Sequence, residues 1–117
     1  VRFEQVYPAM AGSVRLTCEE LDVAKVCDLA DIVFLALPHR LPMTLVPQFL
    51  ERNLRVVDLS ADFRFNDAAV YEAAYQPHTA KDLLAQAVYG LSEIYAEAIR
   101  TANLIGNPGC YLYPDSQ

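Results

Sequence analysis

Several features that define whole classes of protein are missing from this sequence of 117 residues. Its three cysteines, Cys18, Cys27 and Cys110, are odd in number and widely spaced, which fits neither a disulfide framework nor a metal-ligand pattern. The first residues lack the basic stretch and long apolar run of a secretory signal. The longest apolar run, residues 32–38, is too short to cross a bilayer. We therefore expect a protein of the reducing cytoplasm, with no metal site and no membrane partner.

Positive charge is also scarce. Nine Lys and Arg residues stand against 15 Asp and Glu residues, and the formal net charge is −6. No basic run is available to hold the phosphates of a nucleic acid or an anionic membrane surface. If the ligand is an anion, single arginines must hold it locally.

The apolar content, 54% of the residues, is high enough for one modest domain. Residues 31–37 form a near-continuous apolar run that Pro38 ends, which predicts a strand covered on both faces in a parallel sheet. Residues 41–52 have helical apolar spacing, with Pro42 suited to the first turn and Pro47 a candidate kink. A second apolar strand follows at 54–59, which completes a βαβ unit.

The flanking segments extend this pattern. We expect a helix at 18–29 capped by Thr17, and a helix reaching Tyr75 that begins at Asn66 or Asp67. The remaining patterns predict helices at 83–86 and 94–102, and short strands at 87–89 and 103–105. The fold class is α/β, with a parallel sheet flanked by helices whose ligand would lie at the carboxyl ends of the strands.

Three polar loops follow three of these strands: Pro38 and His39, residues 60–64, and residues 107–110. In a parallel sheet such loops converge on one edge, so their residues can share a site. This geometric inference identifies no reaction by itself.

Cys110 follows Pro-Gly at the end of a strand, where a helix would begin. Backbone N–H groups at such a turn can lower a thiol pKa and bind a developing oxyanion, which favours a nucleophile. The alternative is a small buried apolar residue. Cys18 and Cys27 lie at helical positions and are expected to be packing residues.

Other polar residues of these loops have two or more interpretations each. Arg64 can clamp a phosphate or carboxylate, or be a solvated surface arginine. Asp62 can orient Arg64, although capping its own turn is the simpler role. His39 can carry a proton, contact a cofactor ring or be structural. His78, in a polar loop, is expected to face solvent.

Four segments taken together resemble one enzyme family. They are VFLALPH at 33–39, DLSADFR at 58–64, VYGLSE at 88–93 and NPGCY at 107–111. In order and spacing they resemble the N-acetyl-gamma-glutamyl-phosphate reductases, over about residues 1–111. The resemblance implies a cytoplasmic enzyme of arginine biosynthesis, homo-oligomeric at full length, with an NADP-binding Rossmann domain and a catalytic α+β domain.

The resemblance also implies roles for individual residues. Cys110 would attack the acyl-phosphate substrate, phosphate would leave, and NADPH would reduce the resulting thioester to the semialdehyde. Arg64 would hold the substrate phosphate, as in the related aspartate-semialdehyde dehydrogenases, and Asn107 would position that phosphate or the oxyanion. Pro38 and His39 would lie near the cofactor.

The sequence departs from the family in several places. The family's glycine-rich phosphate loop and catalytic histidine have no counterpart here, and Arg40 stands where the family usually has glycine after Pro-His. We therefore expect residues 1–111 to form a partial Rossmann domain that lacks its first βα unit and the catalytic domain. Residues 112–117 would be an aberrant tail, consistent with a frameshift or a truncated gene model.

Two further hypotheses remain open beside an inactive fragment of the reductase. One is a fragment of an aspartate-semialdehyde dehydrogenase, and the other is a non-catalytic binding module with a Rossmann-like fold. A partial sheet of this kind would also expose a strand edge, which favours aggregation or dimerisation.

Overall fold

A four-stranded, fully parallel sheet organises the chain in the computed structural model, which describes residues 1–65, 68–74 and 77–109. The strand order is β1-β2-β4-β3. The elements are α1 (Phe3–Val6), η1 (Pro8–Met10), α2 (Val23–Leu29), β1 (Ile32–Leu35), α3 (Leu41–Glu51), β2 (Arg55–Asp58), α4 (Ala68–Ala74), α5 (Lys81–Leu84), β3 (Val88–Tyr89), α6 (Ser92–Thr101) and β4 (Leu104–Gly106). The α/β class and the parallel sheet flanked by helices, both predicted from the sequence, are confirmed.

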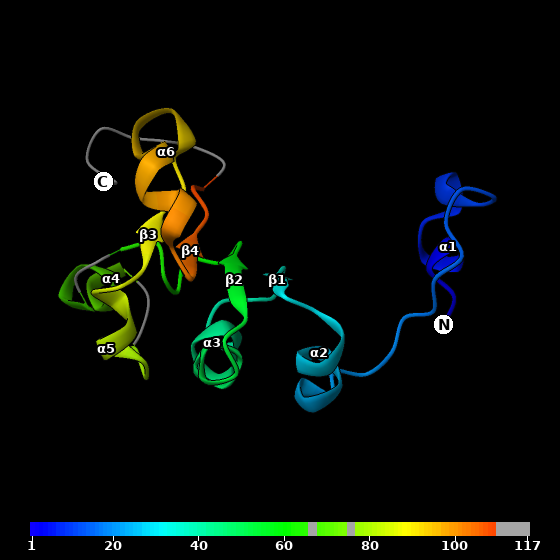
Figure 1. The fold of residues 1–117 in the computed structure, drawn as a ribbon, viewed down its shortest axis with the longest axis horizontal. Coiled ribbons are helices and arrows are strands. Elements are labelled where there is room, and N and C mark those ends of the chain that lie inside the picture. The colour runs from blue at the N-terminus through cyan, green and yellow to red at the C-terminus, as the bar shows by residue number, and fades with distance from the viewer. Residues whose placement is uncertain (66–67, 75–76, 110–117) are drawn as a thin grey trace.

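Helices lie on both sides of this sheet but cover it unequally (Figure 1). The helices α2, α3, α4 and α5 lie on one side, while α6 lies on the other, over β3 and β4. The guanidinium of Arg55 ties α6 to the sheet, since Nε donates to Ala102 O at 3.0 Å and Nη2 donates to Ile99 O at 3.3 Å. Arg55 thereby binds carbonyl oxygens at the end of α6, where a helix runs out of its own N–H donors.

The core lies between the sheet and α3. Alternation along β2 buries Val56 and Asp58 on this side, and α3 contributes the fully buried side chains of Val46 and Phe49. This βαβ unit agrees with the sequence analysis in the order and kind of its elements, and each bound lies within two residues of the expected one. Pro42 stands in the first turn of α3, and the helix runs through Pro47 to Glu51.

The expectation that β1 is covered on both faces is wrong. Val33 and Leu35 face the core, but Ile32 is 43% exposed and Phe34 is 66% exposed. The reason is that α6 covers only the β3–β4 half of the opposite face, and β1 is the last strand of the described sheet. The apolar sequence of residues 31–37 is typical of a strand buried on both faces, whereas the described residues cover only one face of β1.

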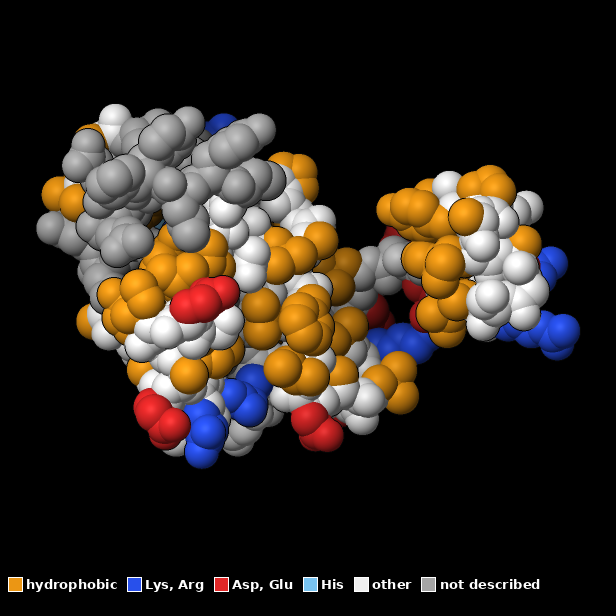
Figure 2. Space-filling model, turned by 90° about the horizontal axis from the view of Figure 1, so that it is seen from above, with side chains coloured by type: hydrophobic (Ala, Val, Ile, Leu, Met, Phe, Trp, Pro, Cys, Tyr) orange, Lys and Arg blue, Asp and Glu red, His pale blue; other side chains and the backbone are white. Residues whose placement is uncertain are grey.

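The N-terminal residues form a separate lobe. An isolated bridge pairs Arg2 with Thr17, and the Phe3 N–H donates to Leu16 O at 2.8 Å. Thr17 therefore does not begin a helix, contrary to expectation. Helix α2 begins later because the side chain of Asp22 accepts a hydrogen bond from the backbone N–H of Lys25, which makes Asp22 the N-cap. Figures 1 and 2 show the lobe standing apart from the sheet and joined to it by a narrow neck.

The other elements lie close to their predicted places. The strands expected at 87–89 and 103–105 and the helix expected at 94–102 are present as β3, β4 and α6 with shifts of one or two residues, and α5 starts earlier than the helix expected at 83–86. Asn66, Asp67 and Tyr75, which bound the helix expected after the βαβ unit, lie outside the described residues. None of the helices in the described ranges has the length and apolar character needed to cross a bilayer.

Candidate functional site at the carboxyl ends of the strands

The loops after β1 and β2 meet at the carboxyl edge of the sheet. The backbone N–H of Ala61 donates to Nδ1 of His39 at 3.0 Å. This bond requires Nδ1 to be unprotonated, so the neutral ring carries its proton on Nε2. His39 therefore has a structural contact, and Nδ1 is already committed to the protein.

The loops after β2 and β4 meet at the same edge, through Arg64. Its Nε donates to the backbone oxygen of Asn107 at 2.8 Å, and its Nη2 donates to Leu59 O at 3.3 Å and Ser60 O at 3.2 Å. The geometric prediction that the three loops converge is thus confirmed for the described residues. The interpretation of Arg64 as a solvated surface arginine does not fit these bonds.

This anchoring decides how Arg64 can bind an anion. Both Nε and Nη2 donate to backbone oxygens. Among the described residues, none accepts a hydrogen bond from Nη1, so that nitrogen remains for an oxyanion. The arginine is held along one edge and presents the other, with the side chain half-buried. Such fixed donors favour binding because little reorganisation is needed when the ligand arrives.

Close packing beneath this edge depends on Gly106. A Cβ at that position would overlap the backbone oxygen of Phe63 and come within 3.0 Å of Arg64 Cα. The loop bearing Arg64 can therefore lie directly on the end of β4 only because Gly106 has no side chain.

The turn that follows β4 is described as far as Gly109. The Asn107 backbone N–H donates to Asp58 O at 2.8 Å, and its side-chain Nδ2 donates to Pro108 O at 3.0 Å. Cys110 comes next in the chain and lies outside the described residues, as does the tail at 112–117. The structure thus brings Arg64, Asn107 and His39 together at the edge from which Cys110 continues.

The amino-acid sequence of the chain matches a known protein family. A model described as "Semialdehyde dehydrogenase, NAD binding domain" matches residues 1–102. The chain belongs to the semialdehyde dehydrogenase family. The matched part of that family is its nicotinamide-nucleotide-binding domain.

Curated relatives extend the likeness. The chain is 56% identical to an N-acetyl-gamma-glutamyl-phosphate reductase of Desulforapulum autotrophicum over 108 residues, which are 92% of this chain and 31% of that protein. Proteins of the same name from Syntrophobacter fumaroxidans and Geobacter sulfurreducens are 54% and 49% identical over 94% and 91% of the chain. The resemblance inferred from the four sequence segments is confirmed. The chain spans about a third of the length of these relatives.

In this semialdehyde dehydrogenase domain, α3 is the helix that follows β1. Helix N-termini commonly bind a diphosphate, but two N–H groups at the start of α3 already have a side-chain partner. Asp62 accepts hydrogen bonds from the backbone N–H groups of Arg40 at 3.0 Å and Met43 at 3.0 Å. These two N–H groups are therefore already occupied, and Pro38 and His39 lie in the loop between β1 and α3.

Asp62 has a different role from either of those expected. Its carboxylate caps α3, a helix about twenty residues earlier in the sequence, and also accepts from the hydroxyl of Tyr71 at 2.8 Å. It neither contacts Arg64 in the described bonds nor caps its own turn. Sequence separation hides such a cap, because the usual cap signal is local.

Arg40 lies beside this cap in an unusual conformation. Its φ is +88°, in the region that favours glycine. The glycine that the resemblance leads us to expect after Pro-His fits this backbone, and Asp62 binds the strained peptide N–H.

Two other sequence expectations are corrected. His78 is 3% exposed, not solvent-facing: Nε2 lies 2.5 Å from Asp62 O, and the ring stands edge-on to Phe63 and Tyr71. Cys18 is exposed because the segment before α2 is extended rather than helical. Cys27 is half-buried against the core, as expected of a packing residue.

The sequence analysis missed the roles of Asp58 and Ser60, which are both buried. Burial raises the pKa of the Asp58 carboxyl, and the hydrogen bonds from Ser60 oppose this rise. An acidic residue ending an apolar strand was the signal that could have identified this pair.

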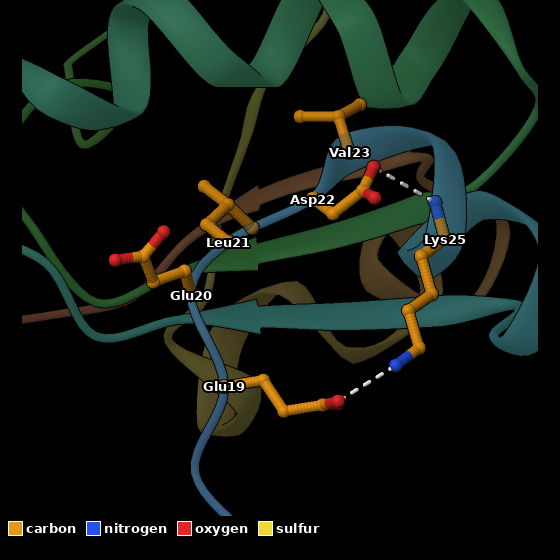
Figure 3. Close-up of a pocket in the computed structure, with 6 residues that line it drawn as sticks. All are labelled: Glu19, Glu20, Leu21, Asp22, Val23 and Lys25. Atoms are coloured by element: carbon orange, nitrogen blue, oxygen red, sulfur yellow. Dashed lines mark hydrogen bonds and ion pairs between the residues drawn. The ribbon is translucent and has the colours of Figure 1, made fainter.

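A pocket at the start of α2 has no residue of the strand-end loops in its lining. It is lined by Glu19, Glu20, Leu21, Asp22, Val23 and Lys25. Figure 3 shows the Lys25 ammonium turned toward Glu19, with which it forms an ion pair at 2.7 Å. Within the described ranges no three acidic, His or Cys side chains are grouped to hold a metal ion. Glu19, Glu20 and Asp22 are exposed.

Proposed function

We propose that this chain is part of an NADPH-dependent N-acetyl-gamma-glutamyl-phosphate reductase of arginine biosynthesis, an enzyme of the cytoplasm that is homo-oligomeric at full length. The observation that carries the proposal is the anchored Arg64 beside Asn107, at the turn leading into Cys110. The names of the curated relatives support the same chemistry.

In this proposal the Cys110 thiolate attacks the acyl-phosphate carbonyl carbon. A carbon–sulfur bond forms, the carbon–oxygen bond to phosphate breaks, and phosphate leaves with the electron pair. The Nη1 group of Arg64 binds a phosphate oxygen and stabilises its charge as it departs. Asn107 holds the turn through its bonds to Pro108 O and Arg64.

The cofactor would supply the hydride that reduces the thioester. Pro38 and His39 are proposed to line one side of it, with His39 oriented by its bond to Ala61. Because the start of α3 is already capped, we expect the chain alone to bind the dinucleotide weakly and to show no NADPH-dependent turnover.

The test is single-turnover acylation rather than steady-state activity. The purified chain is mixed with N-acetyl-gamma-glutamyl phosphate, and mass spectrometry follows acylation of Cys110 while a phosphate assay follows release. We expect a thioester on Cys110, none on Cys110→Ser, and slower formation in Arg64→Gln. Exposed Cys18 in the same chain serves as an internal control.

Two outcomes would contradict the proposal. Faster acylation by β-aspartyl phosphate would favour the sister aspartate-semialdehyde dehydrogenase. Equal iodoacetamide labelling of Cys110 and Cys18 at every pH would indicate an ordinary thiol and a non-catalytic binding module.

A further inference from the structure

The loop that carries Arg64 is built around a carboxylate that the proposed chemistry does not use. Asp58 is fully buried at the end of β2. Its Oδ1 accepts from the backbone N–H of Ser60 at 3.0 Å, and its Oδ2 accepts from the Ser60 hydroxyl at 2.8 Å. Two bonds to one residue fix both the main chain and the side chain of Ser60.

Ser60 then passes this constraint to the guanidinium. Its backbone oxygen accepts from Arg64 Nη2 at 3.2 Å, while its hydroxyl oxygen accepts from the backbone N–H of Asp62 at 3.1 Å. The hydroxyl therefore joins Asp58 to the segment just before Arg64. The direction of the Ser60 carbonyl depends on the two bonds to Asp58.

A second route runs from Asp58 through the main chain. The Asp58 backbone oxygen accepts from Asn107 N–H at 2.8 Å, and the Asn107 oxygen accepts from Arg64 Nε at 2.8 Å. Both anchored nitrogens of Arg64 are thus bound to groups that Asp58 itself holds. Leu59 supplies one further backbone oxygen.

We propose that Asp58 is a positioning residue for the Arg64 guanidinium. Its carboxylate acts through Ser60 on Nη2, and its backbone oxygen acts through Asn107 on Nε, so that Nη1 faces the anionic ligand. The inference rests on the proposed function for the identity of that ligand. It adds that a buried carboxylate sets the orientation of the Arg64 guanidinium, although this carboxylate touches neither substrate nor cofactor.

The experiment measures arginine side chains directly by NMR in the ¹⁵N-labelled chain. The Nε–H signal of Arg64, assigned with Arg64→Lys, reports the bond to Asn107. The Nε–H signal of Arg55 is a matched reference, because it donates to a backbone oxygen of Ala102 beyond the opposite end of the sheet. Ser60→Ala and Asp58→Asn are compared with Ser92→Ala, an exposed serine at the start of α6.

In both loop variants we expect proton exchange at Arg64 Nε to become about tenfold faster, with Arg55 unchanged. Ser92→Ala should leave both signals unchanged. Unchanged exchange at Arg64 in both loop variants would overturn the proposal. Equal acceleration at Arg64 and Arg55 would also overturn it, since general loosening of the fold would then explain the effect.

A separate titration tests the ligand. Inorganic phosphate added to the unaltered chain should shift the Arg64 signals and leave those of Arg55 in place. If phosphate moves neither, the substrate role of Arg64 fails, while the exchange data still decide whether Asp58 positions it. Weaker phosphate shifts in Ser60→Ala than in Ser92→Ala are expected if positioning and binding are coupled.

Discussion

At the scale of single residues, the clearest strain lies in the backbone of Arg40. Arg40 adopts a φ of +88°, which strains any residue with a Cβ. We expect Arg40→Gly to stabilise the chain by about 0.5–1 kcal/mol, because relief of this strain exceeds the entropy that glycine adds to the unfolded state. Urea unfolding followed by circular dichroism would measure it.

The matched control is Arg52→Gly. Arg52 has an ordinary φ of −100° at the end of α3, so this change relieves no strain and should not stabilise the chain. Equal effects in the two variants would show that the charge, not the backbone, is responsible.

The shifted pKa of the Asp58 carboxyl predicts that the free energy of unfolding depends on pH. Its folded-state pKa is raised above the ordinary value of 3.8, chiefly by burial. The folded chain therefore holds this proton more tightly than the unfolded chain, so the contribution of Asp58 to stability is greatest below pH 3.8 and is lost as pH rises through the folded-state pKa.

The variant Asp58→Asn removes this titration. Unfolding free energies of the unaltered chain and of the variant are measured from about pH 3.5 upward, across the range in which this carboxyl titrates. The unaltered chain should have its largest advantage over the variant in acid, and this advantage should fall as pH rises. An advantage that grows with pH would mean that the hydrogen bonds from Ser60 outweigh burial.

At the scale of elements, the junction between β4 and the Arg64 loop is the tightest point. Gly106→Ala would drive a Cβ into the backbone of Phe63, so we expect a loss of about 3 kcal/mol and displacement of Arg64. Gly12→Ala is the control: its Cβ meets nothing within 4 Å, and only its φ of +84° is unfavourable, at about 1 kcal/mol. Thermal unfolding would separate the two costs.

The comparison of sequence with structure is also clearest at this scale. The βαβ unit and the later strands were predictable because their apolar spacing is local and is bounded by proline or glycine. The burial of His78 was not, because it depends on a contact between distant segments. The start of α2 rests on a local cap by Asp22, which the sequence analysis assigned to Thr17 instead. For the site, convergence of the loops followed from parallel topology, but the binding of Arg64 by backbone oxygens did not, since main-chain acceptors leave no trace in sequence.

For the whole molecule, the uncovered half of the sheet predicts self-association. Ile32 and Phe34 stand exposed on the last strand, whose outer edge is unpaired in the described sheet. We expect concentration-dependent dimers or larger species in sedimentation velocity, and a shift toward monomer in Phe34→Lys. Ile94→Lys, at an equally exposed position on α6, should not change the distribution.

The separate N-terminal lobe has a consequence for how the chain behaves toward proteases. The buried core begins only at Leu35, and the lobe keeps its own bonds, such as that from Cys18 N–H to Val1 O. Cleavage in the extended segment just before α2 would therefore release a small peptide and leave the sheet intact. Digestion should stop at a resistant body from α2 onward, on which the strand-end loops keep their arrangement.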